Sequence, residues 1–359
     1  MGTKIWNIGK IVGPIASLLT VLLFWNNSPN GLQVTITVVI LVGAIVTAVH
    51  YAEVISAYVG RSIGAVILAL SVTVIEVGLI LAIMTSTDGG APSLGRETVF
   101  SAIMITCNGI IGFSIVAASL KMEAPTFNSE GSGATLGAIA TIATLSFVLP
   151  TFTEGSDGPT FTASQLAFVA LISLGIYFLY LYVLTVRNRE HFEDPENLVV
   201  VPYAHHPTKA AFRTSILFLI IALASVIGLA KIISPSIQDF VLDAGFPLSS
   251  VAVAVALVIL APEGLAAVKS SNRGDLQTGF NLAYGSALAS IGLTIPALAI
   301  ASWILNIELQ LGLSATEIVL FVLTMVVSLV TVSSHRVTLF QGGLHIVIFS
   351  AFLFLAVNP

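Results

Sequence analysis

The sequence has little charge and almost no cysteine. Only 9% of its 359 residues are charged, whereas a soluble domain carries roughly 25%. This shortage excludes a water-soluble enzyme and a disordered chain. Its 13 basic residues are outnumbered by 18 acidic ones, which argues against nucleic-acid binding because that requires a basic surface. The single cysteine, Cys107, permits no disulfide within the chain and no thiolate zinc site.

Apolar residues, in contrast, make up 56% of the chain, and the mean hydropathy is +1.02. Apolar and polar residues do not alternate as they would in a membrane β-barrel. The sequence therefore predicts an all-α polytopic membrane protein with about eleven transmembrane helices, the first of them uncleaved. Eleven stretches approach the roughly 20 residues that cross a bilayer, and they are 5–25, 33–58, 62–86, 98–121, 134–153, 162–186, 210–233, 247–268, 276–305, 316–334 and 337–357.

Basic residues fall unevenly between the two sides that these spans define. Eleven of the thirteen lie on the side of the N-terminus, and only Arg96 and Lys231 lie on the other. Because basic loops stay in the cytoplasm, we predict an inner-membrane protein with its N-terminus cytoplasmic and its C-terminus outside. The outer side carries eight acidic residues, which either concentrate cations at an outer mouth or are simply solvated loops.

Three acidic residues lie inside predicted spans: Glu53, Glu76 and Glu263. A charge at the bilayer centre costs about 2.5–3.5 kcal/mol on insertion scales, so a chain this poor in charge keeps them for a reason. Glu76 and Glu263 each lie past the middle of their spans, approached from opposite faces. We interpret them as functional; the alternative is that they are polar residues that lock helices together.

This opposite placement predicts two inverted five-helix repeats, with ion sites where the halves meet. An odd number of spans in each repeat reverses the orientation of the second. The predicted organisation is an N-terminal helix (1–30), a first repeat (31–186), a cytoplasmic linker (187–209) and a second repeat (210–359). We interpret the linker, which contains several acidic and histidine residues, as solvated; an alternative is that it senses internal Ca²⁺ or pH.

Hydroxyl and amide side chains accompany both intramembrane glutamates. Hard cations prefer such oxygens together with carboxylates, so the set suits Ca²⁺ or Na⁺ better than zinc or copper. Any single serine or threonine could equally serve helix packing. No cofactor is predicted. The residues are Thr73 near Glu76, Ser101 and Asn108 in the following span, and Ser286, Ser290 and Thr294 in the span after Glu263.

Two histidines lie within spans. His50 and Glu53 are three residues apart and could relay protons inward or form a structural pair. His345 stands alone in the last span, and we interpret it as a packing residue.

The stretches around these residues resemble the calcium/cation antiporter superfamily, and within it the bacterial ChaA-type calcium/sodium–proton antiporters related to the CAX branch. The resemblance covers the chain from about residue 30 to the C-terminus. The matching stretches are His50–Glu53, Ala69–Glu76, Glu97–Gly112 with Cys107-Asn108-Gly109, Leu260–Glu263 and Gly285–Pro296.

The resemblance implies eleven helices in two repeats, with one acidic residue per repeat that binds Ca²⁺ or protons. These positions are Glu76 and Glu263, with Asn108 and Ser286 as neighbouring ligands. The sequence departs from the CAX signature Gly-Asn-Ala-x-Glu, because Thr73 and a leucine stand where its asparagines would be. The choice among Ca²⁺, Na⁺ and K⁺ therefore stays open.

These observations favour a secondary antiporter that exchanges a cation for protons. A cation offsets the charge of the two ionised carboxylates, and protons must replace it when it leaves, because a bare dianion is costly within the bilayer. The alternatives are an intramembrane enzyme and a passive cation channel. The sequence lacks the His-Glu-x-x-His of a zinc protease and the Gly-x-Ser-Gly of a rhomboid protease.

Overall fold

The computed structural model describes residues 2–25, 31–86, 91–192, 207–247 and 249–358, and these are almost entirely helical. They contain two isolated β-bridges and no β-strand, so the all-α prediction is confirmed. The α-helices are α1 (Gly2–Phe24), α2 (Gly31–Val59), α3 (Arg61–Ser86), α4 (Leu94–Met104), α5 (Ile111–Ser119), α6 (Ser129–Ala143), α7 (Ala163–Tyr182), α8 (Lys209–Asp243), α9 (Ser249–Ser271), α10 (Leu276–Leu305), α11 (Ala315–Val332) and α12 (Leu339–Val357). Short π-helices are η1 (Ile105–Ile110), η2 (Thr144–Val148) and η4 (Val183–Arg187), and short 3₁₀ helices are η3 (Leu149–Thr151) and η5 (Arg189–Phe192).

Within the described ranges, ten helices are long and apolar enough to cross a membrane. They correspond to the second to eleventh predicted spans, with α4, η1 and α5 forming one continuous span from Leu94 to Ser119. The first predicted span, 5–25, coincides with α1, but its described apolar stretch, Val12–Phe24, is shorter than a full span. Most of the predicted linker, at 193–206, lies outside the described residues.

The chain forms two compact units, each built from segments distant in sequence. Unit 1 comprises 1–91 and 201–251, and unit 2 comprises 92–200 and 252–359. Each unit contains segments from both predicted repeats, whereas the repeats divide the chain once, at the linker. The repeats therefore remain a prediction.

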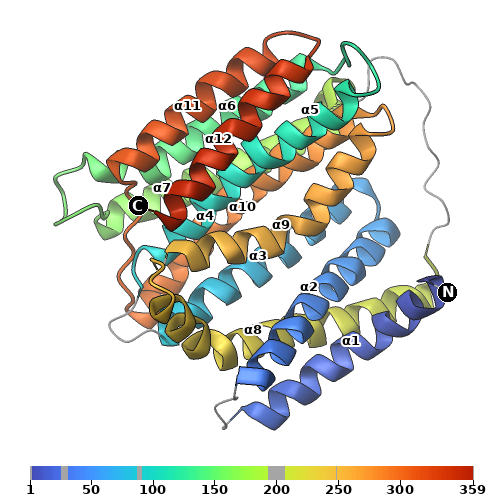
Figure 1. Cartoon of the computed structure of the whole chain (residues 1–359), viewed down its shortest axis with the longest axis vertical. Coiled ribbons are helices and arrows are strands. Elements are labelled where there is room, and N and C mark those ends of the chain that lie inside the picture. The colour runs from blue at the N-terminus through green and yellow to red at the C-terminus, as the bar shows by residue number, and fades with distance from the viewer. Residues whose placement is uncertain (1, 26–30, 87–90, 193–206, 248, 359) are drawn as a thin grey trace. The chain divides into compact units, whose positions relative to one another are not determined.

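Unit 1 contains α1, α2, α3 and α8. Helix α2 packs along α8, α3 packs on both, and α1 packs on α8 and α2; Figure 1 shows the blue α1 and α2 beside the yellow-green α8. Glycine allows one of these close approaches, since a Cβ at Gly78 would lie 2.5 Å from the Ile227 side chain. Stacked rings join α2 to α8, with Tyr51 and Phe218 centroids 5.3 Å apart. Small residues and ring contacts of this kind pack helices where lipid gives no hydrophobic drive.

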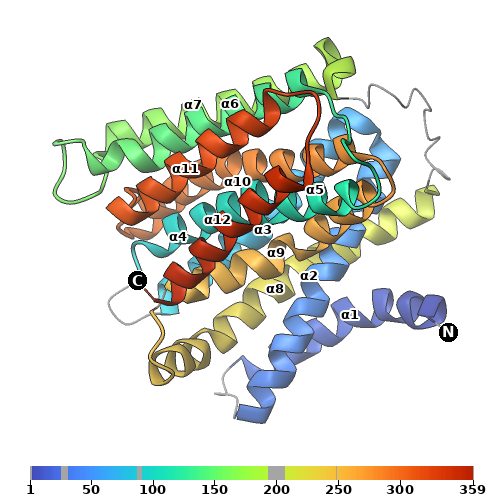
Figure 2. The same ribbon diagram turned by 45° about the horizontal axis from the view of Figure 1, so that its top comes forward.

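Unit 2 is organised around α10 and the continuous α4–η1–α5 helix. Helix α10 packs against α6 and α7, and α12 packs against η1 and α5. Figure 2 shows α12 alongside the continuous α4–η1–α5 helix. The α10–α7 contact is tight at Gly292, where a Cβ would lie 2.8 Å from the Cβ of Tyr177.

Two β-bridges join pairs of loops in unit 2, and the loops they join occupy corresponding positions in the two predicted repeats. Thr126, before α6, pairs with Arg336, before α12. Thr160, before α7, pairs with Gln310, before α11. Each bridge thus joins the loop before the fourth helix of one predicted repeat to the loop before the fifth helix of the other. This pattern is the one that two repeats related by a two-fold axis would produce.

Candidate cation site

Glu76 lies within α3, an apolar helix that contains no other acidic residue. Its side chain is buried, with 3% of its surface exposed. Thr73, three residues earlier and therefore on the same face, is buried as well. Unit 1 thus places a carboxyl group and a hydroxyl group together on one face of an apolar helix.

Glu263 lies within α9 and directly follows Pro262, the proline inside that helix. Because proline has no N–H, the carbonyl of Val258 one turn earlier loses its helical donor. The Ser286 hydroxyl of α10 donates a hydrogen bond to the Glu263 carboxylate. The half-buried Glu263 and Ser286, predicted as ligands of one site, are therefore brought together within unit 2.

Ser290 and Thr294 follow Ser286 at four-residue steps along α10. Both side chains are buried, Ser290 with 7% of its surface exposed and Thr294 with none. The spacing keeps all three hydroxyl groups on one face of the helix, so the polar stripe predicted from the sequence leads into the interior of unit 2.

Asn108 lies in the middle of the π-helix η1 and is fully buried. Its amide nitrogen donates to the Thr324 hydroxyl of α11 over 2.9 Å. A π-helix interrupts the regular α-helical register and is frequent at functional sites. Ser101, predicted beside Asn108, instead donates to the Glu97 carbonyl of its own helix. Of the two, Asn108 is the one whose side chain reaches another helix.

Glu76 and Glu263 fall in different compact units, each described here by itself. Their predicted convergence on one site therefore stays a prediction. Among the described residues, no three His, Cys, Asp or Glu side chains gather as a metal-binding group. A cation bound by either carboxylate there would complete its coordination with hydroxyl, amide or carbonyl oxygens and water, as hard cations prefer.

The second predicted proton group, His50 and Glu53, lies on α2. The His50 Nδ1 atom is 3.8 Å from a Glu53 carboxylate oxygen, and the two side chains are 22% and 59% exposed. The structure pairs them as their spacing predicts. Whether the pair carries protons remains a hypothesis.

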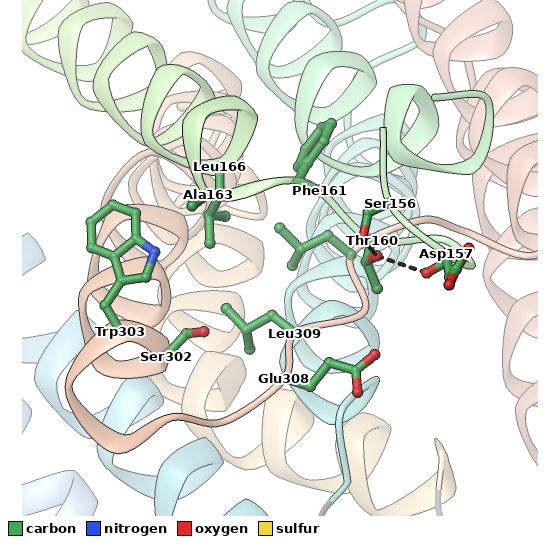
Figure 3. A pocket seen from close by; sticks show the side chains of 11 residues that line it. Ser156, Asp157, Thr160, Phe161, Ala163, Leu166, Ser302, Trp303, Glu308 and Leu309 are labelled. Carbon is green, nitrogen blue, oxygen red and sulfur yellow. Dashed lines mark hydrogen bonds between the residues drawn. The ribbon is translucent and has the colours of Figure 1, made fainter. Parts of the chain in front are cut away.

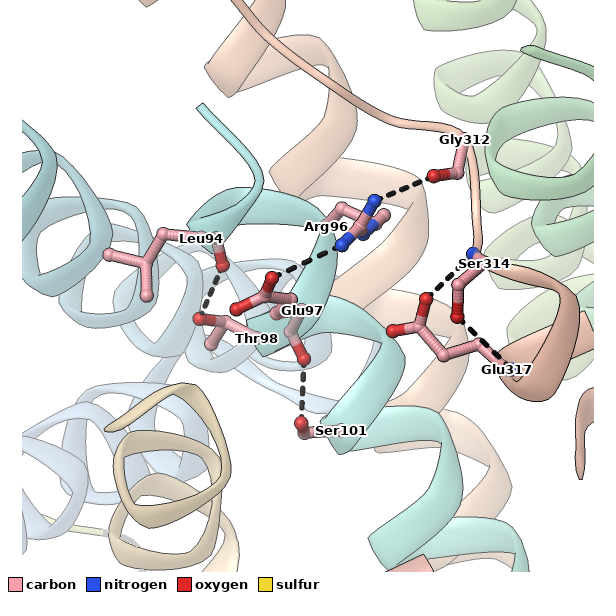
Figure 4. A network of polar contacts seen from close by, with 8 residues as sticks. All are labelled: Leu94, Arg96, Glu97, Thr98, Ser101, Gly312, Ser314 and Glu317. Carbon is pink, nitrogen blue, oxygen red and sulfur yellow. Dashed lines mark hydrogen bonds and ion pairs between the residues drawn. The ribbon is translucent and has the colours of Figure 1, made fainter. Parts of the chain in front are cut away.

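The sequence missed a buried charge pair at the start of α4. Arg96 donates to the Gly312 carbonyl over 2.7 Å and to the Glu97 carboxylate over 3.1 Å; Figure 4 shows its guanidinium between them. Both charged side chains are less than 15% exposed, at 13% and 14%. The sequence analysis treated Arg96 only as an outer-side base, because nothing near it in the sequence reveals its burial or its bond to the Gly312 carbonyl, 216 residues away.

An unpredicted cavity of about 390 Å³ lies between the α6–α7 and α10–α11 loops of unit 2. Asp157, Trp303 and Glu308 are among the side chains that line it, and Figure 3 shows Trp303 near the end of α10 and Glu308 on the loop that follows. None of the predicted site residues lines it. The cavity therefore belongs to a loop region and not to the intramembrane carboxylates.

Most of the chain is similar in sequence to two bacterial proteins. An ionic transporter of Sinorhizobium fredii, y4hA, is 39% identical over 320 residues, which cover 89% of this chain and 87% of the relative. The sodium-potassium/proton antiporter ChaA of Escherichia coli is 30% identical over 352 residues, 96% of this chain and 94% of the relative.

A solved structure shares the fold. The Ca²⁺/H⁺ antiporter protein YfkE has a TM-score of 0.73 and 16% sequence identity, covering 99% of this chain and all of that one (100%). The model of the family described as sodium/calcium exchanger protein matches residues 2–186 and 214–358. With the apolar helices and intramembrane glutamates already described, the chain is a multi-pass membrane protein that belongs to the sodium/calcium exchanger family.

Proposed function

We propose that this protein is a secondary antiporter that exchanges a cation for protons, with Glu76 and Glu263 binding cation and protons in alternation. The observation that carries the proposal is that the second helix of each predicted repeat contains a single acidic residue, and that a neighbouring oxygen accompanies it. Thr73 lies on the face of Glu76, and Ser286 donates to Glu263. The similarity to a sodium-potassium/proton antiporter supports the same reaction.

The exchange follows from the cost of buried charge. Two ionised carboxylates inside the bilayer need a cation, and without it they need protons, because an uncompensated charge there is expensive. Cation and protons therefore exclude each other at the site. If only an occupied site passes between inward-open and outward-open states, the two fluxes are coupled. An inward proton gradient then drives the cation out.

The cations we propose are Ca²⁺, Na⁺ and K⁺. Carboxylate, hydroxyl and amide oxygens are ligands for all three, whereas the described residues offer no thiolate cluster that would select a softer metal. The protein acts without an added cofactor and without chemical catalysis, since its proposed task is coupled movement of ions. Membrane lipid surrounds it.

We infer that the two repeats are inverted, at 31–186 and 210–359. In unit 2 the contact between α10 and α7 has its counterpart in the contact of α5 with α12, and α6 contacts α11. Matching capping boxes open α7 and α12, Thr162 with Gln165 and Thr338 with Gln341. Eleven spans in all place the two termini on opposite sides, and the excess of basic residues on the side of the N-terminus puts that end in the cytoplasm and the C-terminus outside the inner membrane. Reporter fusions at residue 359 and in the 187–209 linker should report opposite sides; the same side for both would contradict the inverted repeats.

Inverted repeats also bring Glu76 and Glu263 to one site near the midplane. Cysteines placed at the two positions, in a Cys107→Ser background, should be joined by a short bifunctional thiol reagent. A cysteine at Ser164, at the start of α7, paired with Glu76→Cys is the control that should not react. If only linkers longer than about 15 Å join the pair, one divalent ion with ligands at about 2.3–2.6 Å cannot use both carboxylates.

Flux through proteoliposomes with an imposed pH gradient tests the reaction itself. We expect Ca²⁺, Na⁺ or K⁺ to move against the proton flux and to collapse the pH gradient when added. A channel would pass the cation without moving protons, and an enzyme would do neither. Cation flux that is indifferent to the pH gradient would overturn the proposal.

A further inference from the structure

A chain of buried polar side chains crosses three helices of unit 2. His345 of α12 places its Nε2 atom 3.0 Å from the Thr331 hydroxyl of α11 and its Nδ1 atom 3.3 Å from the Asn108 Oδ1 atom of η1. Asn108 continues the chain to the Thr324 hydroxyl. All four side chains are at most 1% exposed. The sequence indicated a packing residue, and the structure adds hydrogen-bond partners at both ring nitrogens of His345.

Small residues bring His345 within reach of Asn108. A Cβ at Gly112, one turn after Asn108, would lie 3.1 Å from the Cβ of His345. From the other side, a Cβ at Gly342 would lie 2.9 Å from the Val116 side chain. Only residues without a side chain permit this approach of α5 and α12, and the approach sets the imidazole against the carboxamide.

The hydrogen bonds fix how the carboxamide is turned. Its nitrogen is engaged by Thr324, so its oxygen faces the imidazole. An oxygen there requires a donor, which His345 provides when Nδ1 carries the hydrogen. The Nε2 atom then lies 3.0 Å from the Thr331 hydroxyl and shares its single hydrogen with the Val327 carbonyl, to which that hydroxyl also donates. Both ring nitrogens and both ends of the carboxamide have a partner in this arrangement, and with this tautomer a reversed carboxamide would set its NH₂ group against the Nδ1–H donor.

We propose that His345 is a positioning residue for cation binding, acting through Asn108. This inference rests on the proposed function, in which Asn108 is a ligand. An amide oxygen can accept twice, so the imidazole occupies one position and orients the other toward the cation. Groups that orient a ligand in this way commonly change metal affinity by about 10–100-fold when they are lost. Thr331 in turn orients the imidazole.

The test compares substitutions of His345 in proteoliposome exchange with Ca²⁺, Na⁺ and K⁺ as probes. His345→Leu should raise the apparent KM of the transported cation about tenfold, with little change in the maximal rate. His345→Asn sets an amide nitrogen near the position of Nδ1 and should restore most of the affinity. His345→Gln places its amide nearer the position of Nε2 and should restore less. Ser114→Ala, a buried hydroxyl of α5 without a hydrogen-bond partner, is the matched control and should behave as wild type.

A double-substitution cycle distinguishes a positioning role of His345 from a role in helix packing alone. If His345 acts through Asn108, then His345→Leu adds nothing to the KM of Asn108→Ala. Additive effects, or a His345→Leu variant with unchanged KM, would overturn the proposal. An unchanged KM in Asn108→Ala would overturn it too. Because His345→Leu could unfold, thermal unfolding of each purified variant is followed, and His345→Asn carries the comparison if the leucine variant is unstable.

The Glu263→Gln variant, measured in parallel, reports on the proposed function separately. If it loses exchange while the His345 variants behave as wild type, only the positioning role fails. If it exchanges normally, the carboxylate mechanism itself fails.

Discussion

The helices that carry Glu76 and Glu263 differ although they occupy equivalent places in the predicted repeats. In α3 the carboxylate is buried, with 3% of its surface exposed, in a helix without an internal proline. In α9 the carboxylate is half-buried, follows a proline and accepts a hydrogen bond from α10. Symmetry of the chain therefore does not make the two carboxylates chemically equal.

The difference suggests separate contributions to one exchange cycle. Pro262 frees the Val258 carbonyl one turn earlier in α9, so that helix has a backbone carbonyl oxygen available in addition to the Glu263 carboxylate. On the face of Glu76, Thr73 of the same helix offers a hydroxyl oxygen. We expect both carboxylates to be required, and the surroundings to decide how much alteration each one tolerates.

The largest expected effect comes from neutralising either carboxylate. Glu76→Gln and Glu263→Gln keep the size of the side chain but remove its charge and its titratable proton. Each should abolish cation-coupled proton flux in proteoliposomes and leave expression nearly normal, because an amide costs less to bury than a carboxylate. Robust exchange in both variants would mean that the glutamates are structural, and His50 and Glu53 would become the next proton carriers.

Shortening the side chains should reveal the asymmetry. Glu263→Asp keeps the charge and loses one methylene, so we expect partial exchange with a weaker apparent affinity. Glu76→Asp should be more damaging, because a tightly buried side chain leaves a gap that its surroundings fill only in part. The measurement is the apparent KM and maximal rate of each variant. Added outside acid should compete with Ca²⁺ in the wild type and in Glu263→Asp. Equal losses in the two aspartate variants would remove the distinction between the helices.

Removing the neighbouring hydroxyls refines the comparison further. Ser286→Ala deletes the donor to Glu263, and a hydrogen bond to a charged group contributes about 1.5–3 kcal/mol. We expect the apparent cation affinity to fall about tenfold, with exchange retained. Thr73→Ser, which keeps the hydroxyl beside Glu76, is the matched control and should change little. An unaltered KM in Ser286→Ala would show that this hydroxyl serves packing alone.

Much of the fold follows from the sequence because membrane spans are set by apolar length. Helix α10 has its predicted bounds, and an Asp275 cap and a left-handed Asn306 mark its ends, both common signals. Other ends were misjudged. Helix α8 runs through Pro235 to Asp243 instead of ending at 233, since membrane helices tolerate proline. Helix α6 begins at Ser129 rather than 134 because Asn128 caps it.

Only part of the candidate site could be predicted from the sequence. Glu76 and Glu263 stand out because charge is rare in an apolar helix, a local signal. The polar chain around Asn108 was invisible, because Asn108 and His345 are 237 positions apart in sequence and meet only after α5 and α12 pack. The burial of Arg96 likewise involves a tertiary contact, to the Gly312 carbonyl, that no sequence window contains.

The smallest expected effect concerns the pair on α2. Glu53→Gln removes a charge whose side chain is 59% exposed and whose distance to His50 is 3.8 Å. Even as an ion pair, which requires a protonated His50, an exposed contact of this kind contributes about 0–1 kcal/mol, so exchange should fall by less than about fivefold and expression should be unchanged. His50→Gln, which removes the other partner, should give the same small effect, and the double variant should be no worse. Proton-coupled flux through proteoliposomes, measured beside Glu76→Gln, checks this. Loss of exchange in Glu53→Gln as complete as in Glu76→Gln would instead make the α2 pair a proton relay that feeds the buried carboxylates, and the contrast between α3 and α9 would then be one part of a longer pathway.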